Sequence, residues 1–97
     1  MNYKIKITDE AEIEIQNARD WYDEQQPGLG QSFVAEIKED INLLKNPAID
    51  HKIVLNGVRR VLTKRFPFVI YYIRDEEKLI VKIIAVLHNR REQLKFG

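Results

Sequence analysis

Apolar side chains recur along this chain with two different spacings, and these spacings predict the order of its elements. Residues 3–7 (YKIKI) alternate between apolar and basic side chains, as a strand with one buried face does. Apolar residues then recur at intervals of three or four between Ala11 and Tyr22, and again between Phe33 and Leu44. That interval is typical of helices with one buried face. The first half of the chain is therefore predicted to form a strand and two helices.

The ends of both predicted helices carry recognisable signals. Asp9 followed by Glu12 has the form of an N-terminal capping box, so the first helix is predicted over 9–25. Residues 26–30 (QPGLG) interrupt it, because proline disfavours a helix at the preceding residue and glycine readily adopts left-handed turns. The second helix is predicted to end at Asn46-Pro47. The short connection predicts an antiparallel helical hairpin.

The second half of the chain has the pattern of a sheet. A polar connector over 48–57 ends in a turn at Asn56-Gly57. Three strands are predicted after it, at 58–62, 66–74 and 79–87. The last is almost continuously apolar, so it should have neighbours on both sides, one of them the N-terminal strand. The prediction is a single α+β domain over 1–97, in which a three-stranded antiparallel meander and the first strand form a twisted four-stranded sheet against the helical hairpin.

Four aromatic residues are candidates for the core. Trp21 and Phe33 fall at the helical corner, where we expect them to be buried. Tyr71 and Tyr72 are adjacent in one predicted strand, so their side chains should point to opposite faces of the sheet. At least one of the two tyrosines should then pack against the helices.

Composition narrows the class of protein. The chain has 97 residues, 44% of them hydrophobic, and no cysteine, which fits one globular domain in a reducing compartment. No apolar run reaches the length of a membrane span, and the N-terminus turns polar too soon for a signal peptide, so we expect a cytoplasmic protein without membrane contact. The chain lacks a glycine-rich phosphate loop, paired carboxylates and metal-ligand spacing. We expect neither a cofactor nor a metal.

Charge is divided unevenly between the two halves. Residues 1–49 hold ten acidic and five basic side chains, a net charge of −5, whereas residues 50–97 hold five acidic and eleven basic ones, a net charge of +6. A basic surface of this kind would attract nucleic acid or an acidic protein segment. The same segregation also arises without function where helices collect glutamates, so charge alone leaves both interpretations open.

Four segments in this order resemble the RelE/ParE superfamily of toxins from bacterial toxin-antitoxin modules. Residues 21–30 (WYDEQQPGLG) are similar to the helical corner of the ParE-like branch. Three further segments are similar to its strand signatures: 57–60 (GVRR), 65–72 (RFPFVIYY) and 85–91 (AVLHNRR). The resemblance covers essentially the whole chain. It implies a toxin that a small antitoxin neutralises in a hetero-oligomer, with acidic antitoxin residues at the contact.

The superfamily contains two activities. ParE-like members poison DNA gyrase by binding it, and the corner motif and the His88-x-Arg90-Arg91 ending resemble them. RelE-like members are ribosome-dependent endonucleases that cut mRNA, and they carry an arginine where this chain has Val69 and a C-terminal tyrosine where it has residues 95–97 (KFG). Gyrase binding is therefore the expected activity. A ribosome-dependent nuclease and a non-toxic relic that only binds its antitoxin are the alternatives.

Basic residues of the second half are the candidate contacts with the target or the antitoxin. They are Arg59, Arg60, Lys64, Arg65, His88, Arg90 and Arg91. Guanidinium groups match phosphate oxygens and carboxylates equally well. Under the nuclease alternative the catalytic residues would be Arg60, Arg65, His88 and Arg91. His88 could act as a base or contact phosphate, or simply be hydrogen-bonded at a strand end. Arg59 should point opposite to Arg60, and His51 is predicted to be exposed without a role.

Overall fold

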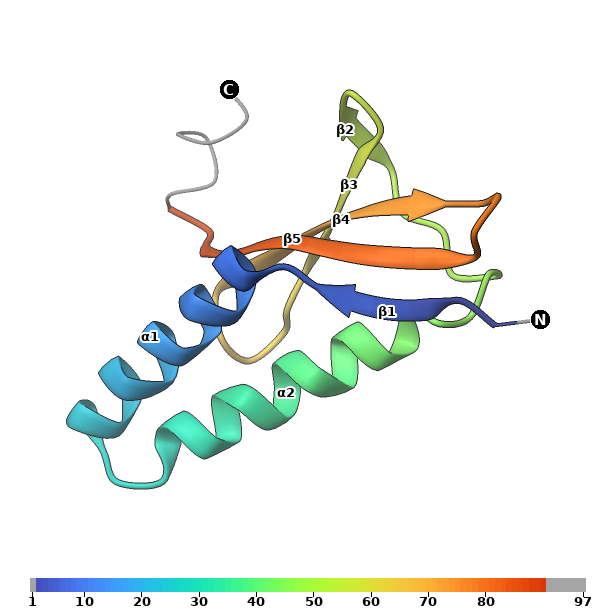
Figure 1. The fold of residues 1–97 in the computed structure, drawn as a ribbon. Coiled ribbons are helices and arrows are strands. Elements are labelled where there is room, and N and C mark those ends of the chain that lie inside the picture. Colours follow the sequence, from blue (N-terminus) through green and yellow to red (C-terminus); the bar gives the residue numbers. More distant parts are fainter. Residues whose placement is uncertain (1, 91–97) are drawn as a thin grey trace.

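The computed structural model describes residues 2–90, which form two helices and a five-stranded sheet in an α+β arrangement. Both helices lie on one face of the sheet (Figure 1). In chain order the elements are β1 (Lys4–Ile7), α1 (Asp9–Gln25), α2 (Leu29–Leu43), β2 (Ile53–Leu55), β3 (Val58–Leu62), β4 (Phe68–Asp75) and β5 (Ile80–His88). The strands are ordered β1-β5-β4-β3-β2 across the sheet.

Strand β5 has neighbours on both sides, as its continuous apolar sequence predicts. It pairs in parallel with β1, where Ile5 lies opposite Val81, and antiparallel with β4. The predicted four-stranded sheet was one strand short, because the connector over 48–57 contains β2. This strand pairs with β3 through a hairpin whose turn residues Asn56 and Gly57 have φ angles of 47° and 78°. An Asn-Gly turn with two positive φ angles is a strong hairpin signal, so the turn itself pointed to a strand before it.

The helical hairpin follows the predicted bounds closely, with two differences. Helix α1 spans the predicted 9–25, but its N-cap is Thr8, whose Oγ1 accepts a hydrogen bond from the Ala11 N–H at 3.1 Å. The capping box predicted from Asp9 to Glu12 was therefore wrong: the cap lies one residue earlier, and Ala11 at its third helical position has no side chain that could return the hydrogen bond. Helix α2 ends at Leu43, before the predicted stop at Asn46-Pro47, and a turn continues from it.

The corner between α1 and α2 depends on two glycines. Gly28 has a left-handed φ of 89° and precedes the first residue of α2. The Gly30 N–H donates to Asp23 Oδ1 at 2.8 Å, which satisfies one of the free amides at the start of α2. A Cβ atom on Gly30 would lie 2.3 Å from the Arg19 carbonyl oxygen. The two helices thus meet closely enough to exclude any side chain at this position.

The main core lies between the helices and the sheet, and a smaller cluster lies on the opposite face. Phe33 and Tyr72 are buried in the main core, whereas Tyr71 is buried in the smaller cluster, so the two tyrosines do point to opposite faces. The prediction for Trp21 was wrong, because its side chain is 55% exposed and contacts Tyr22 edge-on at the surface. Neither helix of the described chain is both long and apolar enough to span a membrane.

Candidate functional site

Six of the seven predicted contact residues fall in three places on the sheet. Arg59 and Arg60 lie in β3, Lys64 and Arg65 in the turn from β3 to β4, and His88 and Arg90 at the end of β5. Phe68 pairs with His88, so the β3–β4 turn and the end of β5 lie at the same end of the sheet. Arg91 lies outside the described residues.

Arg59 faces the connector between α2 and β2. Its guanidinium forms an ion pair with Asp50 at 2.5 Å and donates to the His51 carbonyl oxygen at 2.6 Å. Arg74 of β4 reaches the same carboxylate at 3.2 Å, and its guanidinium lies 4.9 Å from the centre of the Tyr3 ring. The Arg59 side chain is only 17% exposed. These contacts give Arg59 a structural role in holding the connector against the sheet.

His51 belongs to the same network, although it was predicted to be exposed. Its side chain is partly buried, and its Nδ1 lies 2.7 Å from the Tyr72 hydroxyl oxygen. Burial lowers the pKa of His51, and the positive charges of Arg59 and Arg74 lower it further against the opposing effect of Asp50. Burial likewise raises the pKa of Tyr72. The two partners are 21 residues apart in the chain, and nothing in the local pattern around His51 indicates the contact.

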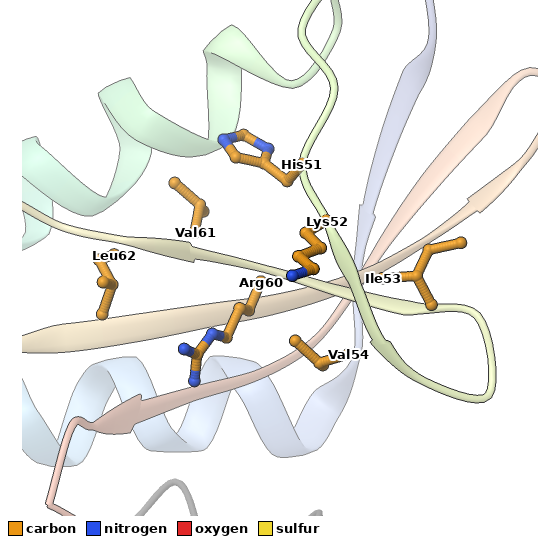
Figure 2. Close-up of a pocket in the computed structure, with 7 residues that line it drawn as sticks. All are labelled: His51, Lys52, Ile53, Val54, Arg60, Val61 and Leu62. Carbon is orange, nitrogen blue, oxygen red and sulfur yellow. The ribbon is translucent and has the colours of Figure 1, made fainter.

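Arg60 points to the side of the sheet opposite Arg59. In Figure 2, His51 and Val61 point toward α2, whereas Arg60 and Val54 point away from it. Arg60 pairs with Tyr71, which belongs to the smaller cluster on the face away from the helices. The predicted alternation between Arg59 and Arg60 is thus confirmed.

A shallow groove lies beside Arg60, between β3 and the start of β2. Its volume is about 580 Å³. The residues that line it are His51, Lys52, Ile53, Val54, Arg60, Val61 and Leu62 (Figure 2). The lining combines two exposed or partly exposed basic side chains with four aliphatic ones. Such a surface suits a partner that is both apolar and acidic.

Lys64 and Arg65 are exposed, and the turn that carries them lies beside acidic residues of α2. The Arg65 backbone N–H donates to Glu36 Oε2 at 3.0 Å, and the Arg65 guanidinium lies 5.1 Å from the centre of the Phe66 ring. The pKa of Asp40 is raised by burial and by neighbouring glutamates, while the positive charge of Lys64 opposes this rise. Part of the positive charge of this turn is therefore balanced within the molecule.

His88 closes β5 at the edge of the main core. Its Nδ1 accepts a hydrogen bond from the Arg90 N–H at 3.2 Å, and its ring meets the Phe68 ring edge-on with centres 5.5 Å apart. His88 pairs with Phe68 on the helix side of the sheet, whereas Arg60 pairs with Tyr71 on the other side. His88 and Arg60 therefore lie on opposite faces of the sheet.

Within residues 2–90, no group of three His, Asp or Glu side chains could hold a metal ion.

Comparison with known proteins agrees with this fold. A family model described as the ParE toxin of the type II toxin-antitoxin system parDE matches residues 5–93. No curated protein matches the chain. Among solved structures, the chromosomal ParDE toxin-antitoxin system from P. aeruginosa is 20% identical with a TM-score of 0.78, over 89% of this chain and 95% of that one. The RelBE2 toxin-antitoxin complex from Mycobacterium tuberculosis is 18% identical with a TM-score of 0.60, over 91% and 92% of the two chains.

Proposed function

Because the chain belongs to the ParE toxin family of type II toxin-antitoxin systems, we propose that an antitoxin holds it inactive and that the released toxin binds DNA gyrase in the cytoplasm. The observation that carries the choice of gyrase is Val69. RelE-like nucleases have an arginine at the corresponding place, whereas Val69 is fully buried in the smaller cluster of this sheet. An arginine could not occupy that position without a large cost of desolvation.

The geometry of the other candidates supports the same choice. A ribosome-dependent nuclease would need Arg60, Arg65, His88 and Arg91 around one phosphate. Arg60 and His88 lie on opposite faces of the sheet, and the Arg65 guanidinium lies against Phe66. We therefore assign these basic residues to protein contacts rather than to catalysis.

The basic residues in the second half of the chain suit an acidic antitoxin as their partner. The two similar structures named above are toxin-antitoxin systems. We propose a hetero-oligomer in which the antitoxin folds as it binds, with acidic residues that contact Arg60 on the face away from the helices and Lys64, Arg65, His88 and Arg90 at the end of the sheet. Arg59 would contribute by fixing the connector beside this surface. The helical hairpin, with its exposed Trp21, is the second surface that we expect the antitoxin to cover.

Induction of this chain alone in a bacterial host, with pulse-labelling of DNA and protein synthesis, tests the proposal. Early arrest of DNA synthesis with double-strand breaks is the expected result. Early arrest of protein synthesis with mRNA cut within codons would replace gyrase by the ribosome as the target. In that case His88→Gln should abolish cleavage, whereas gyrase binding should survive this substitution. Growth without arrest, while the folded protein accumulates, would leave antitoxin binding alone.

A further inference from the structure

The turn between β3 and β4 carries two of the predicted contact residues, Lys64 and Arg65. Its two ends are joined by Thr63, whose side chain is buried. The Thr63 N–H donates to the Phe68 carbonyl oxygen at 3.0 Å, and the Thr63 Oγ1 accepts from the Phe68 N–H at 3.2 Å. The middle of the turn, which carries the basic side chains, is held by a different element.

Glu36 of α2 holds the middle of the turn. The Arg65 N–H donates to Glu36 Oε2 at 3.0 Å, and the Phe66 N–H donates to the same oxygen at 3.5 Å. Hydrogen bonds from N–H groups to a carboxylate are stronger than those between neutral groups. Because the two amides are successive in the chain, this one oxygen fixes the direction that the backbone takes at Arg65.

Helix α2 keeps Glu36 in place, because residues on either side of it in the helix are packed in the core. Phe33, one turn earlier, and Ile37, the next residue, are both fully buried. The Phe33 ring also meets the Phe66 ring edge-on, with centres 5.4 Å apart. Helix α2 therefore contacts both the ring and the backbone N–H of Phe66, and the Glu36 carboxylate reaches the turn from a backbone that close packing immobilises.

Arg65 is the side chain whose direction this arrangement fixes. Its backbone is held by Glu36, and its guanidinium lies 5.1 Å from the centre of the Phe66 ring, which is itself buried. Arg65 as a whole is nevertheless exposed to solvent. An exposed guanidinium on a fixed backbone loses less conformational freedom when it pairs with a carboxylate of a partner, so the pair costs less to form.

We propose that Glu36 is a positioning residue, which holds the β3–β4 turn in the conformation that presents Arg65 to an acidic side chain of the antitoxin. The inference rests on the proposed function, in which Arg65 contacts the antitoxin, and it adds an acidic residue to the basic ones. Charge alone predicts the opposite role, because an acid beside the contact surface repels an acidic partner and its loss would tighten binding. The reach and the charge of Glu36 therefore have opposite expected effects on affinity, and substitutions can separate them.

Two conservative variants of the full chain make this separation. Glu36→Asp keeps the charge, but its side chain is shorter by one methylene group and its carboxylate falls short of the turn. Glu36→Gln loses the charge and keeps an acceptor oxygen at the same reach. Glu39→Asp is the matched control, because Glu39 is an exposed acid of the same helix and the substitution has the same cost in helix propensity.

Three measurements are made on each variant. Calorimetry gives the affinity for the cognate antitoxin, and circular dichroism verifies that the variant is folded. Hydrogen exchange follows the amides of Arg65 and Phe66 in the free toxin, so it reports the geometry of the turn independently of the partner. The affinity of Glu36→Asp is measured again in an Arg65→Ala background, which tests whether the two side chains act together.

We expect Glu36→Asp to bind the antitoxin about fivefold or more weakly, and both Glu36→Gln and Glu39→Asp to bind within about twofold of wild type. The amides of Arg65 and Phe66 should exchange about tenfold faster in Glu36→Asp and nearly as slowly as in wild type in Glu36→Gln. In the Arg65→Ala background Glu36→Asp should have no further effect on affinity, because the side chain that Glu36 positions is gone.

Three results would overturn the positioning role and leave antitoxin binding intact. They are equal or tighter binding by Glu36→Asp, unchanged exchange of the two amides in that variant, and a loss of affinity that persists in full in the Arg65→Ala background. The last of these would show that Glu36 contacts the antitoxin directly. Absence of any binding between wild type and the cognate antitoxin would reject the proposed function and, with it, the role of Glu36.

Discussion

Asp50 is the residue on which the connector between α2 and β2 depends. Its carboxylate accepts from both Arg59 and Arg74, whose side chains are 17% and 8% exposed. Removing this charge would leave two poorly hydrated guanidinium groups close together, and such a loss costs more than the loss of a surface ion pair. Because Asp50 itself is 67% exposed, solvent moderates the effect.

Asp50→Asn should therefore lower the free energy of unfolding by about 1–2 kcal/mol, measured by urea denaturation. Asp20→Asn is the matched control, because Asp20 is 66% exposed and pairs with the exposed Arg19. We expect that control to stay within about 0.5 kcal/mol of wild type. Equal losses in the two variants would contradict the anchoring role of Asp50.

His51 should make the stability of the fold depend on pH. Burial holds its pKa below the usual value of 6.5, and Arg59 and Arg74 act in the same direction. Between the lowered pKa and 6.5, the unfolded chain binds more protons than the folded one, so stability falls as the pH decreases. The contribution is fully present above 6.5 and is lost as the pH falls through the lowered pKa.

We expect wild type to lose more stability than His51→Gln between about pH 7 and pH 5, as measured by thermal unfolding. Glutamine keeps a polar group that can reach the Tyr72 hydroxyl, so the substitution mainly removes the titration. Parallel curves for the two proteins would show that other groups cause the pH dependence.

At the scale of elements, the corner between α1 and α2 combines two glycines with different functions. Gly30 excludes a side chain by contact, since a Cβ would lie 2.8 Å from Asp23 Cγ and closer still to the Arg19 carbonyl. Gly28 has open space around it, and only its φ of 89° disfavours other residues.

Gly30→Ala should lower the free energy of unfolding by about 3 kcal/mol, because the added methyl group overpacks the corner. Gly28→Ala should lower it by about 1 kcal/mol, because alanine is strained at a positive φ. Chemical denaturation of both variants measures the difference, and the reverse order would show that the helices can separate at the corner.

The elements were predictable where one local signal determines them. The apolar spacing and the QPGLG break predicted α1 and the helical hairpin correctly. The continuous apolar run predicted correctly that β5 has a neighbour on each side. Strand β2 has three apolar residues without alternation, too few for a period to be visible, although Asn56-Gly57 marked the hairpin. The prediction for Trp21 was wrong because this residue lies beside the apolar stripe of α1, and only the packing of Tyr22 against Phe33 decides which of the two neighbours lies against the core.

The candidate site was less predictable, because arginines of the same strand have different surroundings. Alternation separated Arg59 from Arg60, but the ion pair of Arg59 with Asp50 spans nine residues and a turn. The contact between His51 and Tyr72 depends on how the connector folds back over β4. The groove beside Arg60 exists because β2 pairs with only part of β3, and the sequence contains no signal for where that pairing ends.

For the molecule as a whole, acidic residues of the first half of the chain and basic residues of the second half come close together in the folded structure. The net −5 of residues 1–49 and the net +6 of residues 50–97 meet where Asp40 of α2 lies near Lys64 and where the Glu36 carboxylate accepts from the Arg65 backbone N–H. Asp50 similarly offsets Arg59 and Arg74. Lys52 on the groove, and Arg90 after β5, extend the basic surface beyond these regions. The attraction for an acidic partner should therefore come from a few residues and act over a short range.

This distribution predicts how salt changes antitoxin binding. Raising the ionic strength from about 50 mM to about 500 mM should slow association by roughly tenfold, because screening weakens the steering of an acidic segment toward the groove. Dissociation should change much less, since it depends on short-range contacts that are screened little once formed. Stopped-flow mixing with the cognate antitoxin measures both rates.

In Lys52→Glu the salt dependence of the association rate should be weaker. Lys78→Glu is the control and should behave more nearly like wild type, because Lys78 lies outside the groove. An association rate insensitive to salt, with all the effect in dissociation, would mean that the basic residues act only after the segment has docked.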